Sequence, residues 1–99
     1  MTVLYTAWAK NQLREIYNYY KEIGVPKKGR KIRISINKKV LQLKTFPFLG
    51  REEEGLSDLG QGHRYIVEGQ YKIIYRIIED NVYVTDIFDT RRNPEAMVP

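Results

Sequence analysis

In the last third of the chain, residues suited to one face of a strand alternate with residues suited to the other face. This is the two-residue period of a β-strand. The alternating runs are residues 63–68, 71–78 and 82–89. Gly69 separates the first two runs, and Glu79, Asp80 and Asn81 separate the next two. These residue types suit tight hairpin turns. The pattern therefore predicts a meander of three antiparallel strands. The runs stop over residues 89–94, because proline cannot donate to a strand ladder and two adjacent arginines resist burial.

The first quarter of the chain has helical periodicity. Its apolar positions recur three or four residues apart, at Leu13, Ile16, Tyr17, Tyr20 and Ile23. Thr6 is a suitable N-cap, and Gly24 with Pro26 ends the pattern, so a helix is predicted over residues 7–23. The short apolar run at 3–5 predicts a strand before it. Tyr17, Tyr19 and Tyr20 are interpreted as packing residues, although stacking on nucleic-acid bases is an alternative.

Residues 27–46 fit two periods. Ile32, Ile34 and Ile36 alternate as in a strand, whereas Ile32, Ile36, Val40 and Leu43 follow one face of a helix. About twenty residues without a turn signal exceed a typical strand, so a second helix is predicted. Pro47 ends it, because the residue before a proline avoids helical geometry. The following loop, 51–62, is predicted to pack Leu56 and Leu59 on the core.

The length and composition indicate a single domain without disulfides or a metal site. A chain of 99 residues is expected to form one domain, 1–99, and lacks the cysteines of a disulfide framework or thiolate metal site. The single His63 also argues against a metal site, so neither a metal nor another cofactor is predicted. We expect a cytoplasmic protein with no membrane partner, because the sequence has neither a signal peptide pattern nor a long apolar run.

Positive charge is concentrated in one part of the sequence. The net charge is +5, and nine cations lie between Glu22 and Glu52 with no acid among them, namely Lys27, Lys28, Arg30, Lys31, Arg33, Lys38, Lys39, Lys44 and Arg51. A solvated helix face would explain any one of these side chains. The block as a whole favours an anionic partner.

The order of these segments resembles the RelE/ParE toxin superfamily. The resemblance rests on Phe46 to Arg51 (FPFLGR), Gly62 to Tyr65 (GHRY), Tyr71 to Arg76 (YKIIYR) and Asp89 to Pro94 (DTRRNP). It implies an α+β fold of β-α-α-β-β-β order, with both helices packed on one face of a twisted antiparallel sheet. It also implies the toxin of a bacterial type II toxin–antitoxin module and a cognate antitoxin with an acidic disordered segment. The first half of the basic block, Lys27, Lys28, Arg30, Lys31 and Arg33, is the predicted antitoxin-binding surface.

Two toxic activities occur among proteins of this kind: ParE-like inhibition of DNA gyrase and RelE-like cleavage of mRNA on the ribosome. Cleavage needs cations at the phosphate and groups that transfer protons. The candidate catalytic residues are Arg64, Arg76, Arg91, Arg92 and, for proton transfer, His63, with Glu52, Glu53 and Glu54 as further candidates. Lys72, Lys38, Lys39 and Lys44 are predicted to bind the target or RNA.

Residues 90–99 contain neither Tyr nor His, which cleaving relatives commonly carry there, so gyrase inhibition is favoured over an mRNA interferase activity. A non-toxic or decayed nucleic-acid-binding module is a third interpretation. Arg64, Arg76 and the Arg91–Arg92 pair are expected to converge on one face or edge of the sheet. The alternative for Arg76 is an ion pair with Asp86 across the hairpin.

Overall fold

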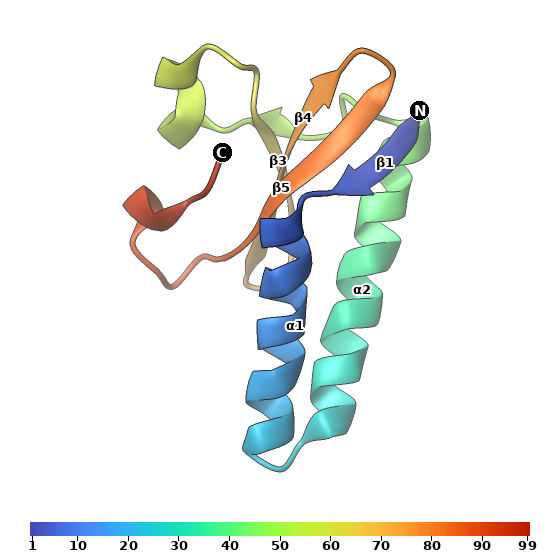
Figure 1. Ribbon diagram of the computed structural model, residues 1–99, viewed down its shortest axis with the longest axis vertical. Helices are drawn as coiled ribbons and strands as arrows, with labels where there is room; N and C mark the ends of the chain where they lie inside the picture. Colours follow the sequence, from blue (N-terminus) through green and yellow to red (C-terminus); the bar gives the residue numbers. More distant parts are fainter.

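The computed structural model describes all 99 residues, and its helices and strands follow the predicted order (Figure 1). The elements are β1 (Thr2–Tyr5), α1 (Ala7–Glu22), α2 (Pro26–Thr45), β2 (Arg51–Glu52), the 3-10 helix η1 (Glu54–Leu59), β3 (Arg64–Glu68), β4 (Tyr71–Ile78), β5 (Asn81–Asp89) and the 3-10 helix η2 (Pro94–Ala96). The short β2, η1 and η2 were not predicted, because segments of two to six residues are too short to show a period.

Local chemistry sets the ends of both helices. The side chain of Thr6 accepts a hydrogen bond from the backbone N–H of Ala9 at 3.1 Å, as an N-cap does. Gly24 supplies the positive φ of +85° between the helices, and Pro26 opens α2. The prediction of a helix over residues 27–46 is confirmed, and it ends at Thr45, two residues before Pro47.

The five strands form one sheet in the order β1-β5-β4-β3-β2. The predicted antiparallel meander β3-β4-β5 is confirmed. The sheet as a whole is mixed rather than wholly antiparallel, because β1 pairs in parallel with β5, with Val3 opposite Val82. The helical hairpin carries the chain from β1 to β2 at the opposite edge of the sheet, and the meander then brings β5 back beside β1. The predicted α+β fold with β-α-α-β-β-β order is confirmed.

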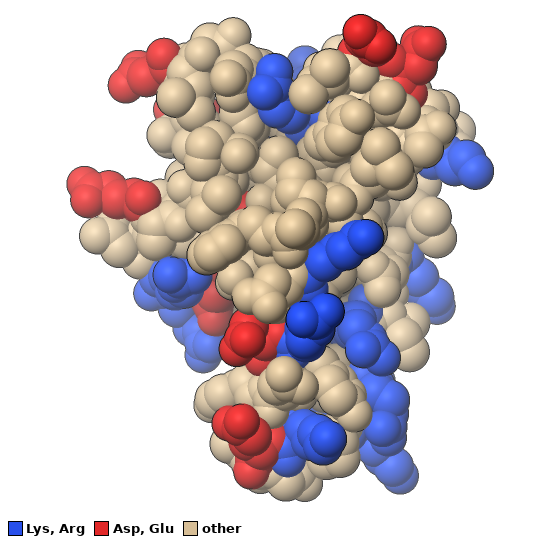
Figure 2. Space-filling view, viewed as in Figure 1, with Lys and Arg blue, Asp and Glu red and all other residues tan.

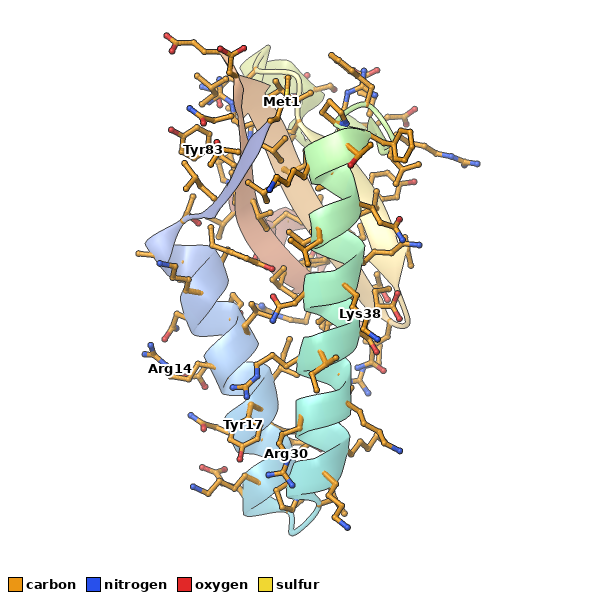
Figure 3. All side chains as sticks on the ribbon, turned by 90° about the vertical axis from the view of Figure 1, so that its right-hand side faces the viewer. Met1, Arg14, Tyr17, Arg30, Lys38 and Tyr83 are labelled. Atoms are coloured by element: carbon orange, nitrogen blue, oxygen red, sulfur yellow. The ribbon has the colours of Figure 1, made fainter.

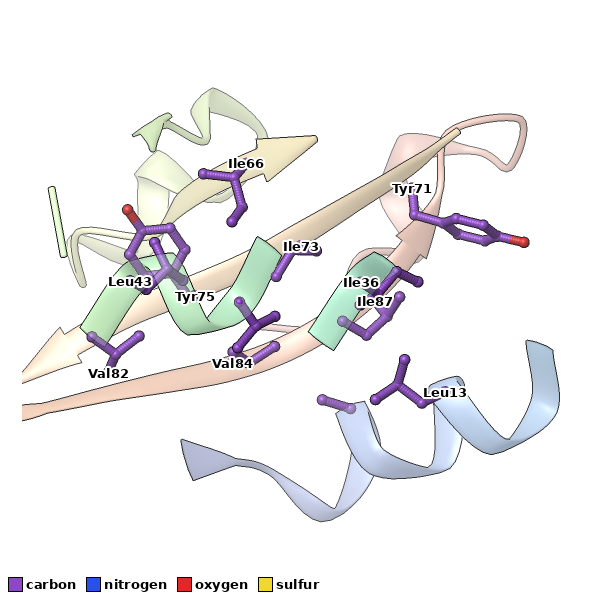
Figure 4. Close-up of a cluster of buried hydrophobic side chains, with 12 residues drawn as sticks. Leu13, Ile36, Leu43, Ile66, Tyr71, Ile73, Tyr75, Val82, Val84 and Ile87 are labelled. Atoms are coloured by element: carbon purple, nitrogen blue, oxygen red, sulfur yellow. The ribbon is translucent and has the colours of Figure 1, made fainter. Parts of the chain in front are cut away.

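Both helices pack on one face of the sheet and bury the larger core there (Figure 4). The helices contribute Ala9, Leu13, Ile36, Val40 and Leu43, and the strands contribute Ile66, Tyr71, Ile73, Tyr75, Val82, Val84 and Ile87. We call this side the helix-covered face. Most of the apolar positions that gave α1 and α2 their helical period are therefore at least partly buried. The exception is Ile23, which follows the last residue of α1 and is 55% exposed.

The opposite side of the sheet, called here the open face, has only a small apolar cluster. It consists of Leu56, Ile74, Phe88 and Met97, so the covering comes from η1 and the C-terminal residues rather than from a long helix. The prediction for the 51–62 loop is half right. Leu56 is buried, whereas Leu59 is 49% exposed because it stands at the end of η1, beyond this cluster.

Candidate functional site

Arg64 and Arg76 lie on opposite faces of the sheet. In the β3–β4 register Arg64 is opposite Tyr75, whose ring is in the helix-covered core. Arg76 follows Tyr75 in the same strand and therefore points to the open face. The expected convergence of these two cations on one face is wrong, because period two fixes faces within a strand but does not fix which faces of neighbouring strands coincide.

Arg64 anchors the loop that follows α2. Its Nη1 donates to the carbonyl oxygen of Gly50 at 2.7 Å, and its guanidinium lies 5.0 Å from the centre of the Phe48 ring. The Tyr75 hydroxyl completes the anchor, because it donates to the carbonyl oxygen of Pro47 at 2.7 Å and accepts from the N–H of Gly50 at 2.9 Å. Arg64 therefore has a clear structural contact, and its catalytic role stays a prediction.

His63 is enclosed at the start of β3. It is 2% exposed, and neither ring nitrogen has a hydrogen-bond partner. The Nε atom of Arg76 is also buried without a partner. Burial, with a smaller contribution from the positive charge of Arg76, lowers the pKa of His63 from its ordinary 6.5. His63 is therefore a neutral, enclosed imidazole at neutral pH.

Glu53 and Lys72 form an ion pair under η1. The Lys72 Nζ lies 2.8 Å from Glu53 Oε2 and 4.3 Å from the centre of the Tyr65 ring. Glu53 is only 4% exposed, and its Oε1 accepts from the N–H of Gly55 at 3.1 Å, which caps η1. The Lys72 ammonium group is thus already engaged in contacts within the chain. Of the three glutamates considered as bases, only Glu53 is buried, whereas Glu52 and Glu54 are exposed.

Arg91 and Arg92 lie at the other end of the sheet from Arg76. Arg91 pairs with Asp89 at 2.8 Å, and this pairing lowers the pKa of the Asp89 carboxyl. The Arg92 guanidinium is 5.8 Å from the Phe88 ring centre. Asp89 is opposite Tyr71, five residues before Arg76 in β4, so roughly 17 Å of strand separates the two groups of cations. The four predicted arginines do not form one cluster.

Asp86 holds the first turn of α1 and the segment after η2 against the sheet, a role that was not predicted from the sequence. Its carboxylate accepts from Trp8 Nε1 at 3.0 Å and from the N–H of Val98 at 2.9 Å. Burial raises the pKa of Asp86 against the opposing effect of these hydrogen bonds. The alternative of an Arg76–Asp86 ion pair is wrong, because Arg76 is opposite Tyr83 and Asp86 is opposite Ile74. The sequence signal for this role was the presence of an aspartate inside the largely apolar strand run 82–89.

Two adjoining cavities lie between the helical hairpin and the strand hairpins. One, of about 270 Å³, is lined by residues that include Gln12, Tyr19, Arg91 and Arg92. The other, of about 250 Å³, is lined by residues that include Lys28 and Lys31. Tyr20 and Tyr71 line both, and burial raises the pKa of Tyr71 to about 12. Tyr20 is buried, so of the tyrosines considered as stacking platforms only Tyr19 is mostly exposed.

The basic block lies along α2, where it makes a strongly charged side of the molecule (Figure 2). Its eight helical members are Lys27, Lys28, Arg30, Lys31, Arg33, Lys38, Lys39 and Lys44, of which only Lys39 is partly buried. None of them takes part in a salt bridge within the chain. For these eight residues, the predicted roles in binding antitoxin, target or RNA thus fall on cations without an acidic partner. Lys28 and Arg33 lie 5.0 Å from the ring centres of Tyr20 and Tyr17.

No group of His, Cys, Asp or Glu side chains is arranged to hold a metal ion. Neither helix combines the length and apolarity of a membrane-spanning segment.

A two-helix hairpin on one face of a small mixed sheet defines a compact α+β fold, and comparison with known proteins assigns the family. Residues 3–94 match the family described as "ParE toxin of type II toxin-antitoxin system, parDE". The chain belongs to this family of toxins. A comparison with curated proteins gave no match.

A solved structure has a similar fold. It is a chain described as "Chromosomal ParDE TA system from P. aeruginosa", which superposes with a TM-score of 0.73. The two sequences are 22% identical, and the match covers 88% of this chain and 92% of that chain. The fold extends over most of both chains.

Proposed function

We propose that this toxin arrests bacterial growth by inhibiting DNA gyrase in the cytoplasm, and that it does so without cleaving RNA. The family supplies the toxin role. The choice of gyrase inhibition over RNA cleavage rests on the enclosed position of His63, the only imidazole in the chain. A general acid or base must come within hydrogen-bond reach of the reacting group. His63 is enclosed, and its pKa is lowered.

The placement of the arginines supports the same choice. Phosphoryl transfer to a 2′-hydroxyl needs several cations around one phosphate. Arg64 is engaged with Gly50 on the helix-covered face, and Arg76 and Arg91 lie at different ends of the sheet. A toxin that acts by binding a protein target has no need of such a cluster. The exposed Arg91 and Arg92 are then candidates for target contact rather than catalysis.

We also propose that a cognate antitoxin with an acidic segment binds along α2 and the outer edge of β3. Only Arg64 and Tyr65 of β3 pair with β2, which leaves the rest of that edge without a neighbouring strand. A cavity of about 330 Å³ beside it is lined by residues that include Lys39, Leu49 and Val67. Unpaired backbone groups, apolar side chains and cations suit an acidic segment that orders on binding.

Two assays with purified protein separate the activities. The first measures supercoiling and the accumulation of cleaved DNA with gyrase, and the second maps cuts in ribosome-bound mRNA. We expect inhibited supercoiling with intact mRNA. Cuts in mRNA with unaffected gyrase would establish the ribonuclease alternative instead. If induced expression of the protein leaves growth unchanged and both assays are negative, the chain is a decayed toxin.

The predicted target contacts are tested by charge-matched variants. Arg91→Ala with Arg92→Ala removes two exposed cations near the end of β5, and Lys10→Ala with Lys21→Ala removes two exposed cations from α1. We expect the first variant to lose growth arrest and gyrase inhibition while keeping its melting temperature, and the second to keep both. Equal toxicity of the two variants would place the target-binding surface elsewhere.

A further inference from the structure

Beyond toxin activity, we propose that the outward side of α2 binds the backbone of double-stranded DNA. We call this surface the basic ridge, and it consists of Lys27, Arg30, Arg33, Lys38 and Lys44. Arg30 and Lys38 are labelled on α2 in Figure 3. All five side chains are exposed, and no Asp or Glu occurs in the helix.

The charges of the basic ridge are uncompensated within the chain. The two salt bridges of the structure, Lys72–Glu53 and Arg91–Asp89, involve none of its members. Like charges along one helix repel each other, and this repulsion destabilises the free protein. A polyanion relieves that repulsion and releases its own counterions, so binding is favourable and salt-dependent.

The dimensions of the basic ridge fit a duplex. From Lys27 to Lys44 the helix advances roughly 26 Å, and an α-helix is narrow enough for the major groove of B-DNA. Ile34 and Leu41, which are 53% and 63% exposed, lie among the cations. These side chains are suited to contact sugars or thymine methyl groups. The ridge has no free aromatic platform, which a single-stranded ligand would require.

Two other anionic partners fit the basic ridge less well. A membrane-surface helix inserts its apolar face, but the apolar face of α2, with Ile36, Val40 and Leu43, is buried against the sheet. An acidic peptide that orders on binding needs pockets for its anchoring side chains. None of the four cavities is lined by a member of the basic ridge. The antitoxin surface proposed above lies instead along the β3 side of α2, where Lys39 lines a cavity. Lys27, Arg30 and Arg33, which were predicted from the sequence to bind the antitoxin, are assigned here to the duplex.

The test is binding of the purified full-length chain to a labelled DNA duplex, followed by fluorescence anisotropy between about 50 and 200 mM salt. The ridge variant carries Lys27→Ala, Arg30→Ala and Lys38→Ala, none of which makes a hydrogen bond or ring contact through its side chain. The control variant carries Lys10→Ala, Arg14→Ala and Lys21→Ala on α1. Both changes lower the net charge of +5 by three.

We expect the ridge variant to bind the duplex at least about tenfold more weakly, with the salt slope reduced by about 3, because each lost phosphate contact removes about one unit of slope. The control variant should bind within about threefold of the unchanged chain. Equal losses in both variants would overturn the proposal, because binding would then follow net charge alone. Tighter binding to poly-glutamate or to single-stranded RNA than to the duplex would also overturn it. Growth arrest and gyrase inhibition are measured separately, so failure here leaves the toxin mechanism standing.

Discussion

The two faces of the sheet differ in what they bury. The helix-covered face holds twelve buried residues, all of them apolar or aromatic, packed between strands and two long helices. The open face holds an apolar cluster of four, and on that side Glu53, His63 and Asp86 are buried as well. Glu53 and Asp86 are hydrogen-bonded, whereas His63 has no partner, and a buried polar group without a partner costs free energy. With fewer apolar contacts as well, the open face contributes less stability per residue.

This difference indicates how stability is distributed between the two faces of the sheet. Local opening takes place where apolar contacts are few, and short covering segments open more readily than packed helices. Only η1 and the C-terminal segment cover the open face, and Asp86 is the residue that holds that segment through Val98. We infer that the helix-covered face supports the fold, whereas the covering of the open face moves first.

The largest expected effect is loss of packing on the helix-covered face. Ile73→Ala should lower the free energy of unfolding by about 2–5 kcal/mol, because the fully buried side chain leaves a cavity between strand and helices. Met97→Ala on the open face should cost about 2 kcal/mol or less, because Met97 lies outside the strands and the two long helices, so its surroundings relax into the space more easily. Urea unfolding measures both. Equal costs would show that the two faces are packed alike.

The next effect concerns the hydrogen bonds that hold the loop after α2. Tyr75→Phe should cost about 1–3 kcal/mol, because the N–H of Gly50 and the carbonyl of Pro47 lose their partner. Tyr65→Phe is the matched control on the open face, since the Tyr65 hydroxyl has no hydrogen bond within the chain. Its expected cost is under about 0.5 kcal/mol. A similar loss in both variants would argue against the anchoring role of Tyr75.

The two ion pairs should differ in how much each contributes to stability, and the more buried pair, Lys72–Glu53, should contribute more. Lys72→Ala should cost about 1–2 kcal/mol, because it leaves the buried Glu53 carboxylate without its cation. Arg91→Ala should leave the melting temperature unchanged, because the Arg91 side chain is mostly exposed and its attraction to Asp89 is screened. Thermal unfolding at low and high salt distinguishes them. A salt-sensitive loss in Arg91→Ala would contradict this ranking.

The smallest effect is a pH dependence that originates at His63. Its folded pKa lies below the ordinary 6.5, so the unfolded chain takes up the proton first as the pH falls. The stability that neutral His63 contributes is therefore present above pH 6.5 and is lost as the pH falls through the folded pKa. The melting temperature should drop between about pH 7.5 and pH 5.

His63→Phe provides the control, because it keeps an aromatic ring and removes the titration. This variant should show a flatter pH profile over the same range. The raised pKa of Asp86 acts in the opposite sense, since that residue adds stability as it becomes protonated at lower pH. Asp86 is present in both proteins, so their difference isolates His63. Parallel profiles would show that another group titrates.

Much of the fold was predictable because its signals are local. Thr6, Gly24 and Pro26 mark helix ends through capping, positive φ and a fixed φ, and each acts on its immediate neighbours. The strand meander was predictable for the same reason, because its turns join neighbours in sequence. The candidate cations were also identifiable by type, since exposed arginine and lysine on strands and loops are visible in the sequence.

The sequence by itself determined the two helices, the meander, the family resemblance and the concentration of charge on α2. Only the tertiary structure decided the parallel pairing of β1 with β5, the opposite faces of Arg64 and Arg76, and the contact of Asp86 with Trp8 and Val98. The physical reason is the range of the interactions. Capping, turns and periodicity act within a few residues, whereas strand register and buried hydrogen bonds join residues that are far apart in the sequence. The positions of the candidate site residues relative to one another depend on these long-range interactions.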